Sequence, residues 1–109
     1  MFETRFATKN IIKNHRKVKF AINITKLSDF EYKIDSVSYS RNGKDFIWEN
    51  NMTNKYLTYK ISKTFGVYNK LTLNNKLVKT HEIGSVSWYI IDDTTVIPCS
   101  LIDEAVEMF

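Results

Sequence analysis

The stretch from residue 37 to residue 48 reads VSYSRNGKDFIW, with apolar and polar side chains alternating on both sides of an Asn42-Gly43 pair. Asn-Gly readily supplies the two residues of positive φ that a type I′ hairpin turn needs. Alternating side chains point to opposite faces of a strand, so one face of this hairpin is apolar. The pattern predicts a half-buried antiparallel hairpin in which Val37 faces Trp48 and Tyr39 faces Phe46.

Further strands are predicted on both sides of this hairpin. Residues 18–24 alternate apolar and polar side chains, and residues 32–34 continue the alternation. Because Val37 falls on the other parity, we expect a bulge at Asp35 or Ser36. Downstream, strands are predicted at residues 70–73, 76–80 and 86–91, with Asn74-Asn75 as the turn between the first two, the third strand as a central one and residues 92–95 as the turn that ends it.

Two segments carry helix signals. The stronger is the C-terminal one, where Ser100 is a suitable N-cap with Asp103 three residues later, and the predicted apolar face comprises Leu101, Ala105 and Met108. The second segment, residues 54–65, has apolar residues at helical spacing, but its alternation from Leu57 to Ile61 also suits a strand. We therefore expect one α+β domain over residues 1–109, a mostly antiparallel sheet of about six strands with a C-terminal helix and possibly a middle helix. A small all-β barrel is the alternative.

Composition narrows the class of protein. The chain has 109 residues, and 43% of them are hydrophobic, which is enough for one packed core. A chain of this length is too short for a multidomain enzyme. A single cysteine, Cys99, argues against a disulfide scaffold or a cysteine metal cluster. Without a long apolar run or a secretory signal pattern, we expect a cytoplasmic protein with no membrane partner. Lysine, asparagine and isoleucine are abundant, which favours an AT-rich source such as a phage or other mobile element.

Catalytic patterns are weak in this chain. Cys99 with His81 could form a nucleophile and base, and Asp92-Asp93 could hold Mg²⁺ at a strand end, but a buried thiol and a turn are the better interpretations of these residues. The two histidines lack the spacing of metal ligands, and the three glycines are isolated, so no phosphate loop is present. We expect no enzyme, no cofactor and no metal.

Charge supplies the functional hypothesis. Residues 1–79 hold all sixteen basic residues against six acids, whereas residues 80–109 hold six acids and no Lys or Arg. Residues 9–19 contain five basic residues and no acid, a density that favours an anionic partner. The predicted binding residues are Lys9, Lys13, Arg16, Lys17 and Lys19, joined by Tyr56, Tyr59, Lys60 and Lys63, where aromatic and cationic side chains alternate.

Three functions fit this charge distribution. The first is a non-catalytic binding protein, an inhibitor or accessory factor, whose basic face docks on an anionic surface, either an acidic patch of another protein or a nucleic-acid backbone. The second is a direct nucleic-acid-binding protein, whose affinity would fall steeply with salt. The third is a self-assembling protein, in which the acidic C-terminal helix of one copy meets the basic N-terminal segment of the next.

Overall fold

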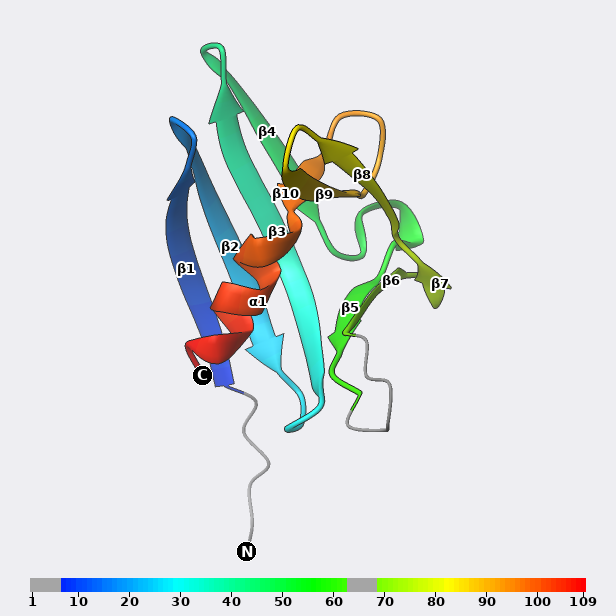
Figure 1. Cartoon of the computed structure of the whole chain (residues 1–109). Coiled ribbons are helices and arrows are strands. Elements are labelled where there is room, and N and C mark those ends of the chain that lie inside the picture. The colour runs from blue at the N-terminus through cyan, green and yellow to red at the C-terminus, as the bar shows by residue number, and fades with distance from the viewer. Residues whose placement is uncertain (1–6, 63–68) are drawn as a thin grey trace, which may run out of the picture.

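The computed structural model describes residues 7–62 and 69–109, which form two antiparallel sheets and a C-terminal helix (Figure 1). In chain order the elements are β1 (Ala7–His15), β2 (Val18–Lys26), β3 (Glu31–Arg41), β4 (Lys44–Glu49), the short 3₁₀ helix η1 (Met52–Asn54), β5 (Leu57–Lys60), β6 (Lys70–Leu73), β7 (Lys76–Leu77), β8 (Lys79–Ile83), β9 (Val86–Ile90), β10 (Val96–Pro98) and α1 (Cys99–Glu107). The predicted α+β class is confirmed.

The larger sheet has the strand order β1-β2-β3-β5-β6-β7, and β4 also pairs with β3. The long strand β3 makes this possible, because its first half pairs with β5 and its second half pairs with β4. The strands β1 and β7 stand at the two ends of that order and do not pair with each other. The sheet is therefore open, and the alternative of a closed barrel is wrong.

The central hairpin forms as the sequence predicts. Asn42 and Gly43 have φ of 52° and 74°, and β3 and β4 pair with Val37 opposite Trp48 and Tyr39 opposite Phe46. The predicted bulge is also present, since Asn23 pairs with Ser36 while Ile24 pairs with Ile34, which leaves Asp35 as the extra residue. Local turn chemistry and side-chain parity thus set the register of this part of the sheet.

The Asn74-Asn75 turn forms between β6 and β7, with φ of 52° and 66°. The strand predicted at residues 76–80 is divided, because β7 stays in the larger sheet whereas β8 pairs with β9 in the smaller one. In that smaller sheet β9 lies between β8 and β10, which confirms the predicted central strand. The chain therefore passes from the larger to the smaller sheet between β7 and β8, where a single strand was expected.

The possible middle helix is not formed in the described part of residues 54–65. Residues 57–60 form β5, which pairs with β3 on one side and β6 on the other. Leu57 and Tyr59 are buried, whereas Thr58 and Lys60 between and after them are more exposed. Burial at every second residue suits a strand with one apolar face, so the period of two prevails over the helical spacing.

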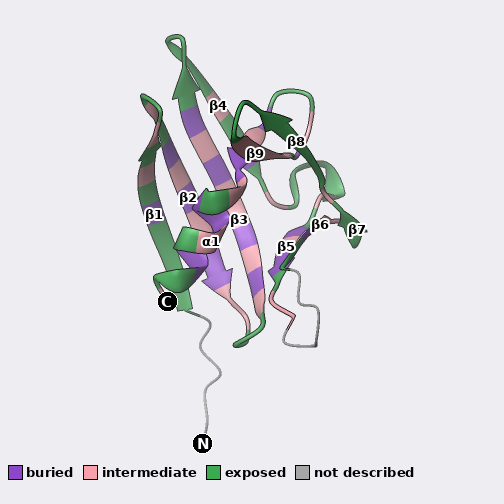
Figure 2. Cartoon of the chain, viewed as in Figure 1, coloured by how far each residue is buried: buried purple, intermediate pink, exposed green. Residues whose placement is uncertain are grey.

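The core lies on one face of the larger sheet, under α1 and the smaller sheet (Figure 2). Ile22, Ile34 and Leu57 from the sheet and Ile102 and Ala105 from the helix are completely buried. The helix also contacts β9 and β10, so it ties the two sheets together. No helix in residues 7–62 and 69–109 is long and apolar enough to cross a membrane.

Helix α1 begins earlier than the sequence predicts. Its N-cap is Pro98 and its first residue is Cys99, so Ser100 lies inside the first turn and does not cap the helix. Because the start moves by two residues, Asp103 falls beyond the first turn, and its carboxylate instead accepts a hydrogen bond from the hydroxyl of Tyr59. The buried face includes Leu101 and Ala105 as predicted, but Met108 is exposed.

Candidate binding surface

The basic segment of residues 9–19 lies in the hairpin of β1 and β2. Strand β1 pairs along its whole length with β2, and Lys9 and Lys13 lie on the same side of β1 as the buried Ile11. The ammonium group of Lys13 is 3.7 Å from a carboxylate oxygen of Glu104 on α1. Lys13 is therefore already paired with an acid of the same chain.

Lys9 is also engaged within the chain. Its ammonium group donates a hydrogen bond to the carbonyl oxygen of Met108 and lies 5.0 Å from the ring centre of Phe109. Lys19, in contrast, points to the opposite face of the sheet, because it alternates with Phe20 of the core. The structure therefore does not bring all five predicted residues of this segment together on one surface.

Arg16 and Lys17 form the two-residue turn between β1 and β2. Both are exposed, and both adopt left-handed backbone conformations, with φ of 47° and 66°. The two tight turns described above use Asn-Gly and Asn-Asn, which tolerate positive φ more easily than Arg or Lys do. This turn therefore places two cations at the tip of a hairpin against their backbone preference.

A second basic tip lies next to the first. Phe20 pairs with Tyr39, so the start of β2 lies beside the end of β3, and both hairpins reach the same end of the sheet (Figure 1). Arg41 and Lys44 flank the turn of the second hairpin and are exposed. We call these two tips the basic hairpin end, which comprises Arg16, Lys17, Lys19, Arg41 and Lys44.

The cations of the basic hairpin end have no acidic partner in the described part of the chain. Within the described residues, none of the five forms an ion pair, whereas Lys13, Lys26 and Lys33 each do. The acid nearest to Lys19 in the strand register is Asp45. It lies opposite Ser40, on the same face of the sheet as Lys19. Arg41 and Lys44 were missed by the sequence reasoning, although their positions beside the Asn42-Gly43 turn were a usable signal.

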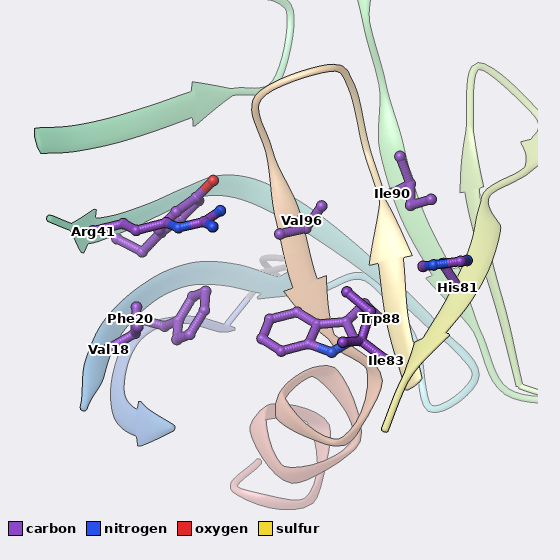
Figure 3. A pocket seen from close by; sticks show the side chains of 9 residues that line it. Val18, Phe20, Arg41, His81, Ile83, Trp88, Ile90 and Val96 are labelled. Atoms are coloured by element: carbon purple, nitrogen blue, oxygen red, sulfur yellow. The ribbon is translucent and has the colours of Figure 1, made fainter. Parts of the chain in front are cut away.

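An apolar pocket of about 220 Å³ opens beside this end, between the larger and the smaller sheet (Figure 3). Phe20 and Arg41 lie on one side of it, His81 and Ile83 lie on the other, and Trp88 lies between them. The lining residues are Val18, Phe20, Tyr39, Arg41, His81, Ile83, Trp88, Ile90 and Val96. The pocket is built from five strands, so no single stretch of sequence contains it.

Contacts within the chain hold two side chains of the pocket lining, Tyr39 and Trp88. The hydroxyl of Tyr39 donates to the carbonyl oxygen of Thr94, and burial raises the pKa of this phenol. The indole of Trp88 packs edge-on against His15, with ring centres 5.5 Å apart, and its buried N–H finds no acceptor among the described residues. The lining is therefore apolar except for the Trp88 N–H, Arg41 and His81.

The second group of predicted binding residues does not join this surface. Tyr59 is only 1% exposed, so it is a core residue and the prediction of a partner contact there is wrong. Tyr56 is half exposed and Lys60 is exposed. In the strand register, however, Lys60 lies opposite Glu31 at the start of β3, ten residues from Arg41 at the end of that strand. At about 3.3 Å per residue, the two ends of β3 are roughly 30 Å apart. Lys63 lies outside the described residues.

Cys99 and Asp92, two of the candidate catalytic groups, have pKa values shifted in opposite directions. Burial, with the nearby charge of Asp103, raises the pKa of the Cys99 thiol, which lowers its thiolate fraction. Burial alone would raise the pKa of Asp92, but hydrogen bonds from Thr94 and Thr95 outweigh it and hold that pKa below its ordinary value. Asp92 thus closes the turn after β9. Among the described residues, no three His, Cys, Asp or Glu side chains gather around a possible metal site.

Comparison of the chain with protein-family models, with curated proteins and with solved structures finds no match in any of the three.

Proposed function

We propose that this chain is a non-catalytic binding protein that docks its basic hairpin end on an acidic surface of another protein. The observation that carries the proposal is the group of five exposed cations on two adjacent hairpin tips, none of which forms an ion pair with residues 7–62 or 69–109. Like charges on adjacent hairpin tips repel one another in the free protein, and an acidic surface would relieve that repulsion. The apolar pocket beside them adds surface that a protein partner can bury.

The backbone of the first tip supports the same proposal. Left-handed conformations cost L-residues roughly 1–2 kcal/mol each relative to glycine. Arg16 and Lys17 adopt them in a turn where Asn-Gly would be less strained. Strained residues that the surrounding structure maintains tend to lie at functional sites, and charge is what these two side chains contribute.

Lys9 and Lys13 lie apart from the basic hairpin end and have partners within the chain. Lys9 and Lys13 contact the C-terminal helix and its end, so part of the charge attraction between the two halves of the chain acts within one molecule. That use leaves less charge for joining two copies. We therefore favour docking on a different protein, in the cytoplasm, and the role of an inhibitor or accessory factor from an AT-rich mobile element belongs to the same proposal.

The test is capture of a partner from nuclease-treated extract of the source cells. The wild-type chain is compared with an Arg16→Glu, Lys17→Glu variant and with a control variant, Lys70→Glu, Lys76→Glu. The control makes the same change in net charge at exposed positions on β6 and β7, outside the basic hairpin end. We expect the wild type and the control to capture the same protein and the hairpin variant to lose it.

Two results would overturn the proposal. One is equal capture by the hairpin variant. The other is binding of duplex or single-stranded DNA or RNA to the purified chain at about 50 mM salt, lost by about 200 mM and lost in the hairpin variant, because that salt dependence is typical of phosphate contacts. In that case the anionic partner is nucleic acid and the basic hairpin end binds phosphates.

A further inference from the structure

We propose that the apolar pocket receives one aromatic or large aliphatic side chain from an acidic segment of the partner, and this inference rests on the proposed docking function. Interfaces between proteins draw most of their affinity from a few anchors that fill desolvated pockets, surrounded by a polar rim. Here an apolar pocket lies directly beside cations that form no ion pair among the residues that the structure describes, and Arg41 belongs to both groups.

The size of the pocket favours a single side chain. Protein interiors contain few voids larger than a water molecule, so an open apolar space of about 220 Å³ is more than a packing defect. An engineered apolar cavity of about 150 Å³ accepts benzene, so a phenyl or isobutyl group has room. Pockets for drug-sized ligands are larger, about 300–1,000 Å³.

The lining favours an apolar group over a nucleobase. A base that enters the pocket would bury several donors and acceptors on its edges, and each needs a hydrogen-bond partner. The Tyr39 hydroxyl is already used by Thr94, which leaves the Trp88 N–H, Arg41 and His81 as polar groups in the lining. A phenyl or aliphatic group makes no such demand and contacts Phe20, Trp88 and the isoleucines.

The residues at the rim of the pocket determine which charges the partner segment carries beside its apolar side chain. Ile83 and Ile90 are 57% and 39% exposed, so apolar surface continues out of the pocket toward solvent. Arg41 lies on the same side of the pocket as Val18 (Figure 3), and Val18 directly follows the exposed Arg16 and Lys17 in the chain. Carboxylates that flank the anchor in sequence would meet these cations, so the recognised segment is acidic around one apolar residue.

Capped heptapeptides provide the probe. The first has a central phenylalanine flanked by glutamates, the second replaces that phenylalanine by alanine, and the third replaces the glutamates by lysines. Binding is followed by NMR through the backbone amides and the two indole N–H signals, of which only Trp88 lines the pocket. We expect the first peptide to shift the Trp88 signal with a Kd below about 1 mM and the other two to bind at least about tenfold more weakly.

Two variants locate the binding. Ile83→Glu places a negative charge at the rim of the pocket, and Ile47→Glu makes the same change on the opposite face of the larger sheet. Both isoleucines are more than half exposed, so neither change removes a core residue. Ile83→Glu is expected to weaken the first peptide at least about tenfold, and Ile47→Glu is expected to leave it unchanged.

The outcomes separate the two proposals. Equal affinity of the phenylalanine and alanine peptides, no shift of Trp88 by any peptide at millimolar concentration, or full binding by Ile83→Glu overturns the anchor. If partner capture is lost in the Arg16→Glu, Lys17→Glu variant but kept in Ile83→Glu, the docking surface stands without the anchor. Selective binding of an oligonucleotide at Trp88 would also overturn it.

Discussion

The hydroxyl of Tyr59 on β5 donates a hydrogen bond to the carboxylate of Asp103 on α1, forty-four residues later in the chain. Tyr59 is buried against the sheet core and its ring lies edge-on to Tyr32. The bond therefore fixes the helix at one position along the larger sheet. Neither residue is available for the roles that the sequence suggested, a partner contact for Tyr59 and a capping acid for Asp103.

Tyr59→Phe keeps the ring and removes the donor to Asp103. A partly buried carboxylate then lacks its hydrogen bond, so we expect the free energy of unfolding to fall by about 1–3 kcal/mol. Urea unfolding followed by circular dichroism measures the change. Tyr56→Phe is the matched control, because Tyr56 is half exposed and no hydrogen bond of its hydroxyl is seen among the described residues. Equal stability of the two variants would show that the Tyr59 bond contributes nothing.

Alkaline pH should destabilise the chain through its buried phenols. Burial, with the charges of Cys99 and Asp103, raises the pKa of Tyr89 to about 12, and burial with the Asp103 bond raises the pKa of Tyr59 further. In the unfolded chain tyrosine ionises near pH 10, so the stabilising contribution is complete below pH 10 and is lost as the pH rises toward 12. Unfolding midpoints measured from pH 8 to 12 should fall, and less steeply in Tyr89→Phe.

Acid should weaken the turn after β9. The pKa of Asp92 is lower in the folded chain than in the unfolded chain, so its contribution is present above the unfolded value, near pH 4, and is lost as the pH falls through the folded value. Asp92→Ala removes the acceptor for the backbone N–H groups of Thr94 and Thr95, and we expect a loss of about 1–2 kcal/mol at pH 7. Asp93→Ala, at the exposed neighbouring position, should change stability by less than about 0.5 kcal/mol.

The Arg16-Lys17 turn should exchange stability for binding. Arg16→Asn, Lys17→Gly gives the turn the residues that its positive φ values favour, so we expect the free energy of unfolding to rise by about 1–2 kcal/mol. The same variant removes two of the five cations of the basic hairpin end and should weaken capture of the partner. If this variant is no more stable than the wild type and captures the partner equally well, both the backbone strain at the turn and its proposed role in binding are contradicted.

Part of the fold was determined by short-range sequence signals. Asn42-Gly43 and Asn74-Asn75 fixed two turns, because these residues adopt left-handed conformations at little cost. The change of parity between Ile34 and Val37 predicted a bulge at Asp35 or Ser36, since each strand has one buried face and a register shift must absorb the difference, and the structure places it at Asp35. These features depend on neighbouring residues alone, and so the sequence could predict them.

Tertiary structure decided the rest. Residues 57–60 fit two periodicities, and pairing with β3 and β6 selected the strand and buried Tyr59. The Arg16-Lys17 turn has no turn-forming residue, and it is held by nine cross-strand pairs between β1 and β2. The pocket brings together β2, β3, β8, β9 and β10, which are distant in the chain. A candidate site assembled from long-range contacts cannot be read from local patterns, because no residue within one stretch specifies which distant strand will lie against it.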